Sequence, residues 1–269
     1  MVFNNEIQEL QPGNNKKIQL IGAKLPTRSA DIYFRAKREE LIAQYYGARI
    51  FLRETETPDW PHWFEHTGDG DVAAFASAMY KEYFYEIALI YYNIIVDLSW
   101  TMCYSAAESE IEGKHGKKFD FGGLATIEEA YQLLRTAESN VTNPTAKSNP
   151  FGDLKARSPQ FGKAIDMVVD FWKSFKEDPI RIKYNFIKHR GKLKDIREQE
   201  ARGSRIFEMS FVTKERTIQL PTDVRDVQYT HNVEESIAEL IKFDNERLFP
   251  YISALIYEIE AVLNPSEFI

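Results

Sequence analysis

The stretch from residue 71 to residue 112 contains neither proline nor glycine, and this feature most constrains the fold. With no helix breaker, the segment is predicted to form one long helix that begins at Asp71, a residue type that caps helices well. Apolar residues occur on every side of its middle section, Phe84 to Val96. A helix that is apolar all round is surrounded by other helices. The sequence therefore predicts an all-α, multi-helix bundle around a long central helix.

The same helix bears on membrane association. Its most apolar part, Ile87 to Val96, is bounded by Glu86 and Asp97 and is much shorter than the roughly 20 residues that span a bilayer. We interpret it as a core helix and expect no membrane contact. The N-terminus lacks the basic start and apolar run of a signal peptide, and the single cysteine, Cys103, cannot form a disulfide within the chain. These features predict a cytoplasmic protein.

Apolar spacing and cap residues predict the remaining elements of one domain covering residues 1–269. Helices are expected over 29–53 and 126–139, from Ser158, from Pro179 to about Arg190, and from His231 or Asn232 to Leu263 with a kink near Pro250. Residues 1–28 are expected to be an N-terminal arm, and the polar segment 140–155 a surface loop or flap. Alternating side chains over 205–220 predict a small β-hairpin appended to the bundle.

The helix beginning at Pro179 has clear boundaries. Asp178 followed by Pro179 is a typical helix start, and Gly191 suits the positive-φ residue that ends many helices. Arg181, Asn185 and His189 are spaced i, i+4, i+8, which predicts one polar stripe. An arginine, an amide and a histidine together can bind a phosphate and move a proton near neutral pH. The alternative is a solvated face on which His189 only caps the helix end.

Positive charge is concentrated around this helix. The chain carries a net charge of −7, which argues against a protein that covers nucleic acid with its whole surface. Residues 181–205 nevertheless contain nine Lys or Arg and three acidic residues. We expect a local anion site here, with Lys188, Arg190 and Lys192 as phosphate-binding residues.

The segment Tyr184-Asn185-Phe186-Ile187-Lys188-His189-Arg190-Gly191, at the end of a helix in an α-helical chain, resembles the HEPN superfamily. Members of that family are α-helical and often dimeric, and many are RNA-cleaving toxins or defence proteins. They are similar in carrying an arginine, commonly followed by a polar residue, with four to six residues between it and a histidine.

The resemblance implies that His189 is the catalytic histidine and that Asn185 lies near the polar position. This chain departs from the pattern, because the arginine positions hold Ile182, Lys183 and Tyr184, and the nearest upstream arginine is Arg181. Either Lys183 or Arg181 substitutes, or the protein is a non-cleaving relative. The implied function is binding of RNA or a nucleotide, with possible metal-independent ribonuclease activity and a homodimeric state.

Two other readings stay open. The chain could be a non-catalytic module that binds another protein or a second copy of itself, through Trp60, Trp63 and the edge of the 205–220 hairpin.

The sequence His62-Trp63-Phe64-Glu65-His66 also matches a zinc-peptidase pattern that works on a long helix. Pro61 and Gly68 bracket it, so we interpret it as a loop and expect neither a metal nor a cofactor.

Overall fold

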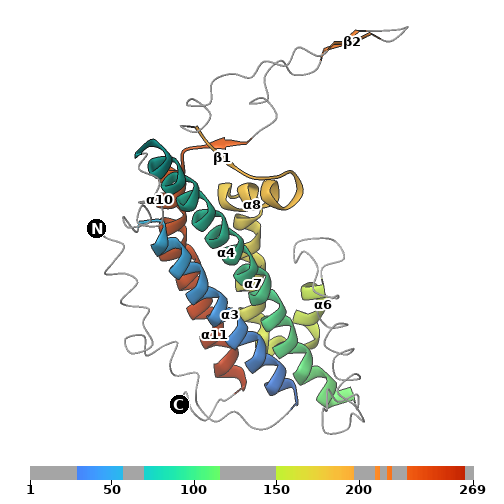
Figure 1. Cartoon of the computed structure of the whole chain (residues 1–269). Helices are drawn as coiled ribbons and strands as arrows, with labels where there is room; N and C mark the ends of the chain where they lie inside the picture. Colours follow the sequence, from blue (N-terminus) through green and yellow to red (C-terminus); the bar gives the residue numbers. More distant parts are fainter. Residues whose placement is uncertain are drawn as a thin grey trace, which may run out of the picture. The chain divides into compact units, whose positions relative to one another are not determined.

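The computed structural model describes residues 29–56, 70–115, 150–196, 210–212, 217–219 and 229–263 (Figure 1). Several expectations concern segments outside these described residues. They are the arm at 1–28, the tryptophans and the histidine pair of the 57–69 segment, and the helix expected at 126–139.

The described part of the chain is all-α, as predicted. The helices are α3 (Ser29–Glu54), α4 (Gly70–His115), α6 (Pro150–Arg157), α7 (Gly162–Phe175), α8 (Pro179–His189), α10 (Val233–Phe243) and α11 (Phe249–Leu263). Short strands are β1 (Lys194–Asp195), β2 (Ser210–Val212), β3 (Thr217–Gln219) and β4 (Thr230–His231). The predicted hairpin is confirmed, because β2 pairs antiparallel with β3 and Phe211 lies opposite Ile218.

The chain divides into two compact units whose segments alternate along the sequence. The first comprises residues 1–49, 91–178 and 243–269, and the second comprises residues 50–90 and 179–242. The long helix α4 contributes its first half to the second unit and its second half to the first. The expected helix is therefore present, whereas a single domain over 1–269 stays a prediction.

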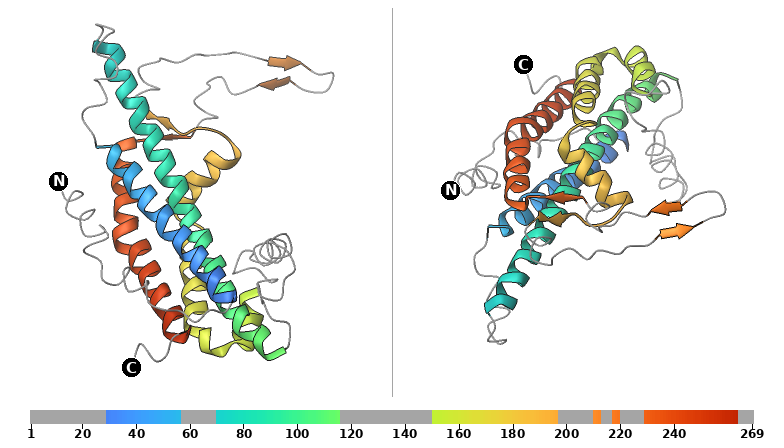
Figure 2. Two further views of the ribbon diagram at one scale, coloured as in Figure 1. Left: turned by 60° about the horizontal axis from the view of Figure 1, so that its bottom comes forward. Right: turned by 90° about the horizontal axis from the view of Figure 1, so that it is seen from above.

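In the first unit, α3 and α11 lie side by side (Figures 1 and 2), and Arg38 Nη1 donates to Glu260 Oε1 at 2.8 Å. Helix α7 packs on α11, where the rings of Phe171 and Tyr251 stack with centroids 3.9 Å apart. Aromatic side chains fill this interior because each buries a large apolar area.

Helix α4 is buried through its apolar middle. By length and composition alone, the segment Ala76–Ala107 could cross a membrane, but 61% of its apolar window is buried inside the protein, as in the core helix of a soluble protein. Tyr85, Leu89, Tyr92 and Ile95 have no exposed surface. This burial agrees with the core helix expected from the sequence.

The prediction of a loop over residues 140–155 is wrong for its last part. Residues Pro150–Arg157 form α6. Proline is tolerated in the first helical turn, where its missing N–H has no partner to lose. Phe151 and Leu154, three residues apart on one face, are fully buried and hold the helix on the core. The polar composition of the segment as a whole concealed these two apolar positions.

The helix expected to start at Ser158 also begins differently. Pro159–Phe161 form a 3₁₀ turn, and the α-helical part α7 starts at Gly162. Ser158 makes no side-chain capping hydrogen bond, and its hydroxyl is buried without a hydrogen-bond partner. Ser158 therefore lies at the helix boundary, as the sequence indicates, but its side chain does not make the hydrogen bond by which serine usually caps a helix.

The C-terminal helix is interrupted near Pro250, as expected. Asn232 Oδ1 caps α10 by accepting the backbone N–H groups of Glu234 and Glu235 at 3.0 and 3.3 Å. A π-helical turn, η6 (Asp244–Leu248), then separates α10 from α11. Pro250 has no N–H to donate to the carbonyl of Glu246, so the regular hydrogen-bond ladder cannot continue through this point.

Candidate functional site

Helix α8 matches its predicted boundaries. It runs from Pro179 to His189, and the backbone N–H groups of Arg190 and Gly191 donate to the Phe186 carbonyl at 2.8 and 3.2 Å. Gly191 has φ 131°, a region that other residues rarely adopt. The glycine lets the chain leave the helix at once, so the side chains of the last turn remain at an open end.

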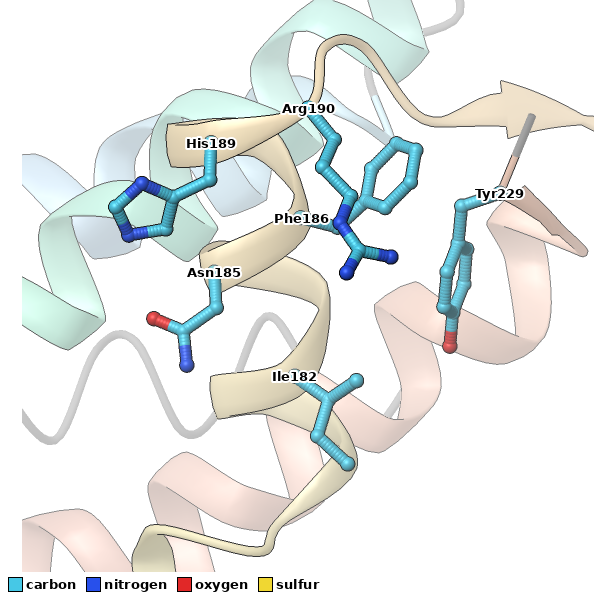
Figure 3. Close-up of a pocket in the computed structure, with 6 residues that line it drawn as sticks. All are labelled: Ile182, Asn185, Phe186, His189, Arg190 and Tyr229. Carbon is cyan, nitrogen blue, oxygen red and sulfur yellow. The ribbon is translucent and has the colours of Figure 1, made fainter. Parts of the chain in front are cut away.

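A pocket of about 490 Å³ lies at this end of α8, within the second unit (Figure 3). Its volume falls in the range of about 300–1,000 Å³ that is typical of small-molecule sites. The pocket is lined by Ile182, Asn185, Phe186, His189, Arg190 and Tyr229. The spacing i, i+3, i+4, i+7 of the first four places them on one face of the helix.

Tyr229 comes from a distant part of the sequence. It is held beside α8 by β1 and β4, which pair in parallel with Lys194 opposite Thr230. The Lys194 N–H donates to the Tyr229 carbonyl at 3.0 Å. As a result, the Tyr229 ring lies against the Phe186 ring, with centroids 5.3 Å apart and planes at 51°. These two rings form the aromatic wall of the pocket.

The polar side chains lie on two sides of the helix end. In Figure 3, the Arg190 guanidinium extends to the side on which Tyr229 lies, whereas Asn185 and His189 point the other way and follow one another along α8. All three are exposed. The structure thus brings together three sequence-predicted residues, one amide, one imidazole and one permanent cation, around a partly apolar hollow.

Arg181 and Lys188 do not line this pocket. Both cations lie over the ring of Tyr184, with the Arg181 Cζ 5.0 Å and the Lys188 Nζ 5.9 Å from its centroid. They occupy a neighbouring stripe of α8, because the spacing from 181 to 184 to 188 follows the helical repeat. The expected stripe of Arg181, Asn185 and His189 is therefore only partly formed at the pocket.

Lys183 is buried on another side of α8. Its Nζ donates to Ser236 Oγ at 2.9 Å and to Glu239 Oε2 at 2.8 Å, both on α10. Ile180, three residues earlier on the same face of α8, is also buried. A lysine in this position holds two helices together and does not reach the pocket. The structure thus separates Lys183 from His189.

Lys192 is also engaged away from the pocket. Its Nζ donates to Glu82 Oε2 at 2.7 Å and lies 4.1 Å from the centroid of the Tyr83 ring. The next residue, Leu193, donates its backbone N–H to Glu86 Oε1 at 3.0 Å. Glu82 and Glu86, one turn apart on α4, therefore anchor the segment that leaves α8.

Burial raises the pKa of Glu86 to about 7, although the Leu193 N–H opposes this shift.

A second cluster lies in the same unit but is closed to solvent. His231 Nδ1 and Ser236 Oγ are 2.9 Å apart, and the Lys183 ammonium binds the same hydroxyl. Burial and the charge of Lys183 lower the pKa of His231 to about 4, so the imidazole is neutral near pH 7. Serine, histidine and lysine occur together in hydrolases, but Ser236 is only 2% exposed and no substrate reaches it. The cluster fastens α8, β4 and α10 to one another.

Sequence reasoning missed Tyr229 and the His231 cluster. The segment around residue 229 has no motif, and its position depends on a strand pairing between residues more than thirty positions apart. His231 was considered only as a helix cap, a role that Asn232 fills. Among the residues that the structure describes, no group of three or more His, Cys, Asp or Glu side chains could hold a metal ion.

Comparison of the chain with protein-family models, with curated proteins and with solved structures gave no match. The resemblance to the HEPN superfamily therefore rests on the residues at the end of α8.

Proposed function

We propose that the pocket at the end of α8 binds RNA or a nucleotide. The observation that carries this proposal is one hollow of ligand size that is lined by an aromatic wall and Arg190 on one side and by Asn185 and His189 on the other. A guanidinium presents a planar set of N–H donors that matches a phosphate, and the exposed position of Arg190 leaves it accessible. The pattern at His189 that resembles HEPN ribonucleases agrees with this chemistry.

Cleavage of the bound RNA is the catalytic form of the same proposal. His189 would take the proton of the ribose 2′-hydroxyl as that oxygen bonds to the phosphorus, or would give a proton to the 5′-oxygen as its bond to phosphorus breaks, leaving a 2′,3′-cyclic phosphate and a free 5′-hydroxyl. Arg190 would bind the negatively charged phosphate. Asn185, one turn before His189, would orient the substrate. Arg190 would thus supply the positive charge that the arginine supplies in the HEPN pattern, although Arg190 follows the histidine in the sequence and the pattern's arginine precedes it. A protein that binds without cleaving would be the non-cleaving relative.

Binding is tested by fluorescence anisotropy with a labelled single-stranded RNA over a series of salt concentrations. We expect wild-type binding to weaken as salt rises, because phosphate contacts release counterions. Arg190→Ala removes a charged hydrogen-bond donor worth about 1.5–3 kcal/mol, or roughly 10- to 150-fold in affinity. Arg157→Ala is the matched control, since Arg157 is an exposed arginine near the end of α6. Equal affinities of the two variants, or no binding at any salt concentration, would overturn the proposal.

Cleavage is tested in parallel by incubating the RNA with excess chelator and comparing wild type with His189→Ala. Loss of product in the variant supports a metal-independent ribonuclease. Product formed at the same rate by the variant refutes the role of His189. Binding that depends on Arg190 without any product identifies the non-cleaving form.

A protein-binding role is the second candidate, and the β2–β3 hairpin favours it. This sheet has two strands, so each strand has an outer edge whose backbone groups can pair with another chain. A homodimer or a separate protein partner would fit. Light scattering that shows a monomer at micromolar concentration would exclude self-association, and loss of association on deleting residues 205–220 would support the hairpin as the contact.

A cytoplasmic location also stays a proposal, which rests on the lone, buried Cys103.

A further inference from the structure

We infer that the pocket contains a subsite for one unpaired nucleobase, formed by Ile182, Phe186 and Tyr229 beside the phosphate-binding Arg190. This inference rests on the proposed function and specifies which part of the ligand enters the hollow. Half of the lining residues are apolar or aromatic. A phosphate group gains nothing from such surfaces, because it is held by cations and N–H donors. The apolar wall must serve a different part of the same ligand.

The apolar surface of the wall is available in the free protein. Ile182 is 47% exposed, so its side chain is accessible to a ligand in the pocket. Tyr229 is half-buried, and its backbone is fixed by the hydrogen bond from Lys194. The Tyr229 ring, which contacts the Phe186 ring, lines the same pocket as the exposed Ile182 side chain, and together they offer an apolar surface to a flat ring. A nucleobase stacked on an aromatic side chain contributes about 1–3 kcal/mol.

The polar residues fit the rest of a nucleotide. The Asn185 side chain points away from Tyr229 (Figure 3), so its amide donor and carbonyl acceptor can bind a neighbouring part of the same strand, not the base that stacks on the wall. The Arg190 guanidinium is on the side of Tyr229 (Figure 3), so it can bind the attached phosphate or cover the second face of the base. An aromatic heterocycle that carries a negative charge therefore matches the lining better than either an aliphatic acid or a bare anion.

This arrangement selects against double-stranded nucleic acid. A base in a duplex is stacked on both faces and hydrogen-bonded along its edge, so its entry into a pocket costs a few kcal/mol of unstacking and unpairing. An unpaired base in a loop or at a chain end, or the base of a free nucleotide, enters without that cost. These two sources present the same chemistry, a base with its phosphate, and binding measurements distinguish them.

The experiment uses competition against a labelled single-stranded RNA bound to the full chain. The competitors are the same unlabelled strand, its duplex, the strand with abasic positions, a mixture of nucleoside monophosphates, and inorganic phosphate. We expect the unlabelled strand to compete at least tenfold better than the duplex or the abasic strand. Competition by monophosphates at comparable base concentration identifies free nucleotide as a source, whereas their failure identifies the RNA strand. Effective competition by inorganic phosphate alone would overturn the subsite.

Variants test the residues of the wall. Tyr229→Ala is expected to weaken binding about 5- to 150-fold, the equivalent of losing one stacked base. Tyr229→Phe keeps the ring and should restore affinity. Tyr257→Ala is the matched control, because Tyr257 is a 53% exposed tyrosine on α11. Ile182→Ala is a second test and is expected to weaken binding, and because the side chain is 47% exposed its truncation leaves the fold intact.

The failure of this inference is distinguishable from the failure of the proposed function. Binding that is lost in Arg190→Ala but unchanged in both Tyr229→Ala and Ile182→Ala, with the duplex competing as well as the single strand, overturns the base subsite alone. Absence of binding to every nucleic acid and nucleotide tested overturns both.

Discussion

The stability of this protein should depend on pH in a way that a single substitution at Glu86 reveals. Glu86 is 9% exposed and accepts the Leu193 N–H, and burial raises its pKa from the ordinary value of 4.5 to about 7. The charges that surround it are Glu82, which raises the pKa further, and Lys192 and Lys194, which lower it. The folded state therefore holds a proton on Glu86 over a pH range in which the unfolded chain has lost it.

The sign of the effect follows from the proton balance. Between about pH 4.5 and pH 7 the folded state binds more protons at Glu86 than the unfolded state, so the free energy of unfolding falls as pH rises. The difference between a pKa of 4.5 and one of about 7 corresponds to about 3 kcal/mol at its maximum. The loss is complete once the pH exceeds the folded-state pKa.

His231 changes the free energy of unfolding in the opposite direction over nearly the same pH range. Its pKa is lowered from 6.5 to about 4 by burial and by Lys183, with Lys192 adding to the effect and Asp195 and Glu239 opposing it. The unfolded state then binds more protons below pH 6.5, so stability is present above that value and is lost as pH falls toward 4. Its maximum contribution is also about 3 kcal/mol. The two dependences nearly cancel in the wild-type protein.

Glu86→Gln removes one side of this balance while keeping an oxygen acceptor for the Leu193 N–H. We expect the free energy of unfolding of the variant, relative to that of the wild type, to increase by about 3 kcal/mol as the pH rises from 4 to 6.5. Urea unfolding at half-unit pH steps measures the two profiles. Glu177→Gln is the control, because its side chain is 81% exposed and should leave the profile unchanged. Parallel profiles for wild type and Glu86→Gln would refute the reasoning.

Three further substitutions test the packing and the site. Asp244→Ala should destabilise the protein by about 3–5 kcal/mol in urea unfolding, because it removes the carboxylate whose Oδ2 lies 2.5 Å from the buried Arg49 Nε, although Asn245 Oδ1 still accepts from Arg49 Nη2; a loss under 1 kcal/mol would contradict this. Gly191→Ala should cost about 1–3 kcal/mol, since the positive φ strains any other residue, and an unchanged thermal midpoint would show that the backbone adapts. His189→Ala should change stability by less than about 0.5 kcal/mol, as expected for an exposed side chain, so any effect on RNA would be attributable to the site.

Much of the fold could be predicted because its signals are local. The absence of breakers from 71 to 112, the pair Asp178-Pro179 and the glycine at 191 are each visible within a few residues. Helix α8 begins at Pro179 as expected, and α4 begins one residue before and ends three residues after the predicted span. Helix α6 was missed because only two apolar residues in a polar segment mark it. Their burial depends on what lies beneath them, which the segment itself does not show.

The site was predictable only in part, because local spacing shows which residues share a helix face but not what that face contacts. Local spacing placed Asn185 and His189 on one face of α8, and both line the pocket. It could not show that Lys183, within the same eleven-residue helix, points into the protein toward Ser236 and Glu239. Nor could it bring Tyr229 to the pocket, because that position depends on the pairing of two-residue strands that have no sequence signature of their own.

The central claim is that the end of α8 binds the phosphate of a nucleic acid or nucleotide through Arg190. Its most direct test is the ratio of dissociation constants for one single-stranded RNA, measured at one low salt concentration for Arg190→Ala and for Arg157→Ala. The account predicts that the first variant binds at least ten times more weakly than the second, which should match the wild type. Dissociation constants that agree within twofold would contradict it.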